Sequence, residues 1–184
     1  MDENTSSGSS SNKISEKQAQ ELAGRFDLIY PLTTNLFGYE YGGGPNGNGG
    51  MDNDKKIQVL IYDFGDESGD AVTVGFFWSK DFYTQAELDR YGWKSKTNLA
   101  EMIYINASRL IKYPNDIYST LIHEFQHMIR FNGKFVKYGV SSSTWYCEML
   151  AMLAEDAIAP LIGISHTNPD HVVSENIPRF LDSY

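Results

Sequence analysis

The apolar positions of the chain change their spacing several times, and each spacing predicts a different element. From Ser15 onward they recur every three or four residues, which predicts an amphipathic helix. Pro31 predicts a kink or an interruption of this helix, after which Leu36 and Phe37 extend the same apolar face. Residues 38–54 are rich in Gly and contain Pro45, so we expect a loop there.

The middle of the chain has shorter apolar runs that are typical of strands. Ile57–Phe64 and Val72–Trp78 predict two strands joined through a turn-rich segment, and Met102–Asn106 predicts a third. Thr84–Tyr91 predicts a short helix between the second and third strands.

Helical spacing returns after the third strand. Asn115 or Asp116 is a plausible cap for a helix that runs to about Phe131, and Asn132-Gly133 predicts its end. A loop over 134–143 then leads to a second helix from Trp145 to about Ile158, which Pro160 stops. The order of helix, strands, helix, loop and helix predicts an α+β domain with a small sheet.

Composition sets the domain organisation. The chain has 184 residues, 41% of them hydrophobic, which is enough for one domain with a sizeable core. Residues 1–14 are a Ser-rich tract with little to bury, so we expect a disordered tether followed by a single domain over 15–184. No apolar run reaches the roughly 18 residues of a membrane span.

Charge and cysteine content exclude several function classes. The formal net charge of −9 disfavours binding to nucleic acid or anionic lipid. Cys147 is the single cysteine, which excludes an intrachain disulfide framework and a thiolate cluster. A metal ion would therefore bind mainly to His, Asp and Glu.

Residues 123–127 read His-Glu-Phe-Gln-His within the predicted helix. His123 and His127 are one turn apart on the same face and can share a metal ion. Glu124 is rotated by about 100° from His123, which places it beside the metal, where it can take a proton from water. The alternative is an amphipathic helix with two ordinary histidines and a surface Glu.

The third ligand of a catalytic zinc site is predicted on the next helix. Histidine does not recur at the metzincin spacing, since the next two are His166 and His171. Glu148 lies in the first turns of the helix after the His pair and is not at the third helical position of a capping box. A returning helix can bring it to the metal, and two His with one Glu is a known catalytic zinc set.

The stretches HEFQHMIRFN and WYCEMLAMLAED resemble the gluzincin metallopeptidases, and more narrowly the hyicolysin-like bacterial metallopeptidases. The resemblance extends over 25–38 and 102–110. It implies a zincin-like fold, zinc-dependent hydrolysis of peptide or protein substrates, His123, His127 and Glu148 as ligands, and Glu124 as base. It also implies that Met102–Asn106 is the sheet edge along which an extended substrate pairs.

The sequence departs from the gluzincin pattern in its supporting residues. The Asp expected four positions after the ligand Glu is replaced by Met152, and the nearest acids are Glu155 and Asp156. The partner of the zinc-bound His therefore stays open between these two. The oxyanion donor is also open, and the candidates are Tyr138, Tyr146, His166 and His171. The short segment after Glu148 predicts either a minimal enzyme or one truncated at its C-terminus.

These observations predict a zinc peptidase, with endopeptidase activity as the main hypothesis. The alternative is a non-catalytic surface-binding module in which zinc only holds the helices together. The Ser-rich leader resembles the spacer of a bacterial lipoprotein, so we expect a secreted or envelope location with a lipid anchor upstream. Oligomeric state is not predicted.

Overall fold

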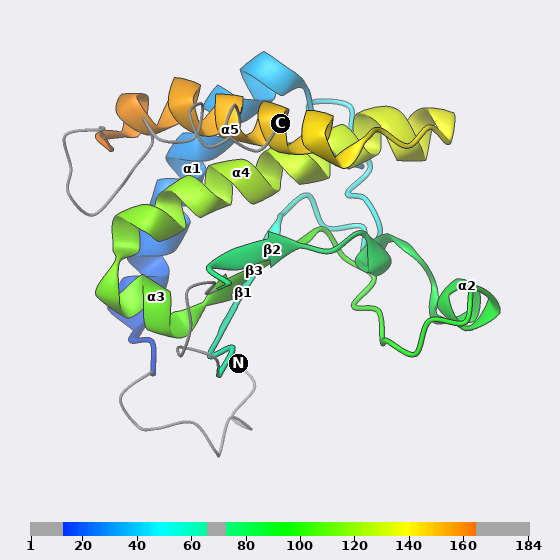
Figure 1. Ribbon diagram of the computed structural model, residues 1–184, viewed down its shortest axis with the longest axis horizontal. Helices are drawn as coiled ribbons and strands as arrows, with labels where there is room; N and C mark the ends of the chain where they lie inside the picture. The colour runs from blue at the N-terminus through cyan, green and yellow to red at the C-terminus, as the bar shows by residue number, and fades with distance from the viewer. Residues whose placement is uncertain (1–12, 66–72, 165–184) are drawn as a thin grey trace.

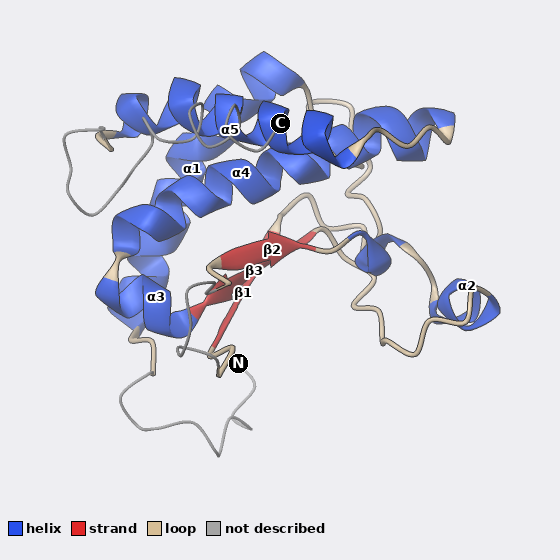
Figure 2. Cartoon of the chain, viewed as in Figure 1, coloured by secondary structure: helices blue, strands red, loops and turns tan. Residues whose placement is uncertain are grey.

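The computed structural model describes residues 13–65 and 73–164. Its main helices are α1 (Glu16–Phe37), α2 (Gln85–Arg90), α3 (Ala107–Lys112), α4 (Pro114–Phe131) and α5 (Thr144–Ile158), and its strands are β1 (Gln58–Tyr62), β2 (Gly75–Phe77) and β3 (Met102–Asn106). Helices and strands both contribute, and the strands form one small mixed sheet (Figure 2). The α+β prediction is confirmed.

The sheet has the order β1-β3-β2, with β1 parallel and β2 antiparallel to β3. The prediction that Met102–Asn106 is an edge strand is therefore wrong, because β3 is the central strand. All five of its residues are buried, which fits a strand with neighbours on both sides. The edge that faces the following helices is β2, in which Phe77 pairs with Ile103.

Helix α4 runs between the sheet and the outer helices α1 and α5 (Figure 1). Its apolar face is fully buried and includes Leu121, Phe125 and Met128. The Phe125 ring contacts the rings of Phe26 and Tyr30 on α1, each with a centroid distance of 5.3 Å. Large apolar side chains of this kind each contribute about 1.5–3 kcal/mol when removed from water. The helix that carries the candidate site is thus held rigidly from two sides.

Helix α1 passes through Pro31 without interruption, so the predicted break does not occur. Proline removes one backbone donor from a helix interior. The hydroxyl groups of Thr33 and Thr34 donate to the carbonyls of Ile29 and Tyr30, four residues earlier in each case. These bonds tie the two Thr side chains to the helix backbone on either side of the proline, and the apolar face continues to Phe37.

The ends of α4 differ from the prediction. The helix begins with Pro114 as its first residue, and neither Asn115 nor Asp116 caps it. It does not stop at Asn132-Gly133 either, because a π-helical turn over Asn132–Val136 continues it and the chain stays helical to residue 138. Gly139, with a φ of 65°, is the glycine that ends this segment.

The remaining elements are of the predicted type, but several differ from the prediction in length. β1 and β2 are shorter than the predicted strands, and α3 was not predicted. Thr84 caps α2 through a capping box with Glu87. α5 begins at Thr144, with Ser143 as its N-cap. Among the described residues, no helix is long and apolar enough to cross a membrane.

Candidate metal centre

His123 and His127 project from the same face of α4, as their spacing predicts. Their ring centroids are 4.7 Å apart, and each side chain is 17% exposed. The rest of the helix is anchored by its apolar positions in the core. The two imidazoles therefore stand at the edge of the core, where they can reach a solute.

Glu148 enters from the second turn of α5 and meets both imidazoles. Its Oε2 lies 3.2 Å from His123 Nε2, and its Oε1 lies 3.5 Å from His127 Nε2. Ligands about 2.1 Å from a tetrahedral ion are about 3.4 Å from one another, so these spacings suit a single zinc-sized ion. The three ligand atoms all lie within 4.8 Å of one another, and the group can hold a divalent metal ion.

The far nitrogen of His123 is held by a second glutamate of α5. Glu155 Oε1 lies 2.6 Å from His123 Nδ1, and Glu155 Oε2 accepts a hydrogen bond of 2.6 Å from the Ser119 hydroxyl. The question left open by Met152 is thus answered by Glu155 and not by Asp156. A carboxylate on Nδ1 fixes the imidazole so that Nε2 faces the centre.

The carboxylates shift the pKa values of the group. Burial favours the neutral form of His123, but the hydrogen bonds to Glu148 and Glu155 outweigh it and raise the pKa of His123 to about 10. The same contacts with His123 and His127 hold the pKa of Glu148 well below its usual range. Glu148 is therefore a carboxylate at neutral pH, as a cation ligand must be.

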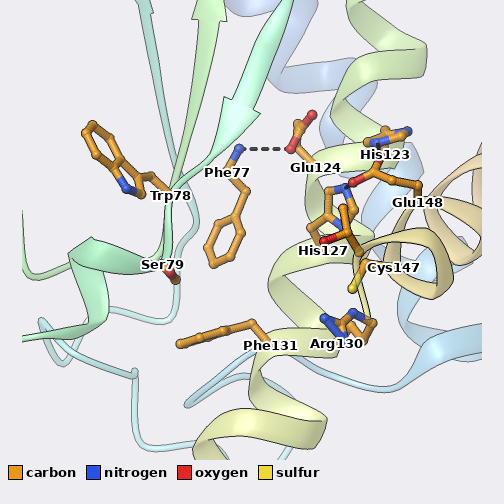
Figure 3. A pocket seen from close by; sticks show the side chains of 11 residues that line it. Phe77, Trp78, Ser79, His123, Glu124, His127, Arg130, Phe131, Cys147 and Glu148 are labelled. Atoms are coloured by element: carbon orange, nitrogen blue, oxygen red, sulfur yellow. Dashed lines mark hydrogen bonds and ion pairs between the residues drawn. The ribbon is translucent and has the colours of Figure 1, made fainter. Parts of the chain in front are cut away.

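Glu124 lies beside this group and makes its own contact with the sheet. The backbone N–H of Phe77, at the end of β2, donates to Glu124 Oε2 at 2.8 Å (Figure 3). Burial raises the pKa of Glu124 above its ordinary value, while His123, His127 and the Phe77 N–H oppose that rise. A carboxylate with a raised pKa is a better proton acceptor than an exposed one.

A cleft of about 420 Å³ opens between the end of β2 and the two helices. Phe77 and Trp78 line the cleft on the strand side, and the charged side chains of α4 and α5 line it on the helix side together with Phe131 (Figure 3). Its described lining residues are Phe77, Trp78, Ser79, His123, Glu124, His127, Arg130, Phe131, Thr144, Cys147 and Glu148. The cleft lies beside β2, whereas the sequence placed the substrate beside Met102–Asn106.

The two candidates for an oxyanion donor that the structure describes do not line the cleft. Neither Tyr138, which is 72% exposed, nor Tyr146 is among the residues that line the cleft. His166 and His171 lie outside the described residues. A lining residue that the sequence analysis did not single out is Arg130, although it lies three positions after His127 and so continues the same helical stripe.

A possible metal centre of two histidines and one glutamate beside a cleft agrees with the metallopeptidase class that the sequence resembles. The chain is similar to the neutral metalloprotease ShpI of Staphylococcus hyicus, with 30% identity over 168 residues that make up 83% of this chain and 33% of that protein. This similarity confirms the resemblance to the hyicolysin-like metallopeptidases. The chain spans about a third of the length of that relative. No protein-family model matches the chain, and no solved structure matches it.

Proposed function

We propose that this protein is a zinc-dependent peptidase of the gluzincin type with a zincin-like domain over 15–184. In this proposal His123, His127 and Glu148 hold the metal ion, and Glu124 is the general base. The observation that carries it is the position of Glu124, which lies on the cleft beside the three possible ligands and is held there by the Phe77 N–H.

Zinc in such a site supplies a Lewis acid that polarises the substrate carbonyl and makes water easier to deprotonate. Glu124 takes the proton of the attacking water and delivers it to the leaving amine. Its raised pKa suits both transfers, since the group has to gain and lose a proton in each cycle. Glu155 holds the His123 ring in the orientation that leaves Nε2 toward the centre.

The proposal extends to substrate and location. A cleft of about 420 Å³ beside the edge strand β2 suits an extended peptide or protein chain and cleavage within it, so we propose endopeptidase activity. We propose an extracellular or envelope location, which the Ser-rich composition of residues 1–14 supports.

Metal analysis combined with digestion of an unfolded protein tests the function. Purified protein is expected to contain one zinc and to cleave unfolded casein, and a chelator is expected to abolish cleavage until zinc is returned. Protein that carries zinc but cleaves no casein or peptide library, with Glu124→Gln indistinguishable from it, would instead support the structural-zinc alternative. Protein without zinc would contradict both.

A further inference from the structure

The guanidinium of Arg130 is a partly buried cation at the cleft that pairs with no described residue. Arg130 lines the cleft, and its Nε and Nη1 atoms are buried without a hydrogen-bond partner. It takes part in none of the ion pairs of the described residues. Leaving a charged donor unpaired away from water costs free energy, so a residue retained in this state favours an anionic partner from outside.

The surroundings of Arg130 favour a carboxylate. Arg130 is the one Lys or Arg among the described residues that line the cleft. The positive end of the α5 dipole adds to its field, because Thr144, the first residue of that helix, lines the same cleft. A planar guanidinium can donate two parallel hydrogen bonds to a carboxylate, which gives this anion both charge and shape complementarity.

The position of Arg130 sets how far that carboxylate is from the scissile bond. In Figure 3 it lies beyond His127, at the end of the cleft away from Glu124. Three residues of helix correspond to a rise of about 4.5 Å, and an extended peptide advances about 3.3 Å per residue. A group bound by Arg130 therefore belongs to a residue within about two positions of the reacting carbonyl, and not to that carbonyl itself.

We propose that Arg130 is a specificity-determining residue that binds a substrate carboxylate within two residues of the scissile bond. This inference rests on the proposed peptidase function and names its substrate class. The carboxylate comes either from an Asp or Glu side chain or from the C-terminus of the peptide. Both sources present the same carboxylate group to the guanidinium, and two series of peptides distinguish them.

The test uses quenched fluorescent peptides of one sequence with blocked ends. Glu is placed in turn at each of two positions on either side of the scissile bond, and each peptide is paired with its Gln isostere. At one position kcat/KM is expected to be about tenfold or more higher for Glu than for Gln, as a charge-assisted hydrogen bond implies. A second series keeps Gln throughout and compares a free C-terminal carboxylate with the amide, which identifies the C-terminus as the source if it gives the larger ratio.

Variants assign the preference to Arg130. Arg130→Gln is expected to bring the ratio of kcat/KM for the Glu and Gln peptides to about one. Arg130→Lys is expected to keep part of the preference, because the positive charge remains but the two parallel hydrogen bonds of the guanidinium are lost. Arg90→Gln is the matched control, because it makes the same change in net charge at an exposed position on α2. If the ratio falls equally in the Arg90 variant, the preference arises from the overall charge of the protein, and the assignment to Arg130 is overturned. If Arg130→Gln does not fold, the native protein and Arg130→Lys still decide the outcome.

A binding measurement separates this inference from the proposed function. The Kd values of the same labelled peptides for the Glu124→Gln protein are read by fluorescence anisotropy, with and without the Arg130→Gln change. If no peptide is cleaved by the native protein, the proposed function fails while the ratio of Kd values still tests Arg130. Ratios near one for every acid and amide pair, or a ratio that the Arg130 change leaves intact, would reject the carboxylate site.

Discussion

Glu155 Oε1 lies 2.6 Å from Nδ1 of His123, so α5 contacts both nitrogens of one imidazole. Glu148 and Glu155 are seven residues apart on α5, which places them two turns apart on the same face. The first carboxylate faces the centre, and the second fixes the ring from behind. Ser119, on α4, completes the contact by donating to the other oxygen of Glu155.

Replacing Glu155 should weaken metal binding without removing a ligand. Glu155→Gln is expected to lower zinc affinity by about 10- to 100-fold, because the neutral amide orients His123 less strongly. Competition with a chromophoric chelator measures this Kd. The neighbouring Asp156→Asn is the control. Equal zinc affinities for the two variants and the native protein would contradict the positioning role of Glu155.

Glu124→Gln should separate chemistry from metal binding. The amide oxygen can still accept the Phe77 N–H but cannot take a proton, so zinc should stay bound while turnover falls by about 10²–10⁴. Glu148→Ala should lose zinc affinity together with activity, because it removes an anionic ligand. Excess zinc is expected to restore part of the Glu148 activity and none of the Glu124 activity. Full activity of Glu124→Gln would refute its assignment as the base.

Metal removal should destabilise the fold, because the possible ligands come from two helices. Binding zinc at a hundred times its Kd adds about 2.7 kcal/mol, which corresponds to a Tm difference of about 5–10 °C for a chain of this size. Thermal melts with zinc and with chelator measure it. Glu148→Ala is the control and should show a much smaller difference. An unchanged Tm in the native protein would mean that the helices are not linked through a metal.

The two histidines could be predicted from sequence because their relation is local. Helical periodicity alone puts His123 and His127 on one face, and the same rule applied to α5 would have paired Glu148 with Glu155. Arg130 could have been found in the same way, three residues beyond His127. In each case the signal was the spacing along one helix.

The contact between Phe77 and Glu124 could not be predicted in this way. It depends on β2 lying next to α4, and hence on the strand order β1-β3-β2, which short-range patterns do not specify. The apolar run at Met102–Asn106 was compatible with an edge or a central strand, and only its pairing with both β1 and β2 distinguishes the two. The Gly133 signal failed because the chain keeps helical hydrogen bonds through a π-helical turn.

A substitution at Gly75 tests whether the close approach of β2 to α4 is needed. A Cβ atom there would lie 2.8 Å from both Thr120 Cγ2 and the Tyr104 carbonyl oxygen. Gly75→Ala should therefore destabilise the protein by about 1–3 kcal/mol and displace the strand that holds Glu124, which lowers turnover as well. Urea unfolding and a peptidase assay measure both effects.

Gly133→Ala is the matched control for this strand. No atom lies within 4 Å of its added Cβ, and its φ is not positive. Because alanine loses less backbone entropy in a helix than glycine, the variant should be as stable as the native protein or more stable. Equal unfolding free energies for the two alanine variants would show that β2 tolerates a side chain at Gly75.

Glu101 should make stability fall as pH rises through neutrality. Burial, opposed by the Met51 N–H, raises its pKa from 4.5 to about 7, so the unfolded chain releases this proton at a lower pH than the folded protein does. The contribution of protonated Glu101 to the free energy of unfolding is fully present below about pH 4.5 and is lost as pH rises to about 7.

Glu101→Gln should remove this dependence and still accept the Met51 hydrogen bond. The variant is expected to match the native protein at pH 4 and to exceed its unfolding free energy by on the order of 1–2 kcal/mol at pH 8. Urea unfolding at the two pH values measures the difference, with the exposed Glu21→Gln as control. A difference that does not change with pH would exclude titration of Glu101 as its source.

The residues of the centre differ in how much chain must be closed to bring them together. His123 and Glu155 are 32 positions apart and lie in one helical hairpin, whereas Phe77 and Glu124 are 47 positions apart and need the sheet between them. Closing a shorter loop loses less entropy, and local contacts form earlier than distant ones. We therefore expect the contacts that join His123 to α5 to form earlier in folding than the contact between Phe77 and Glu124.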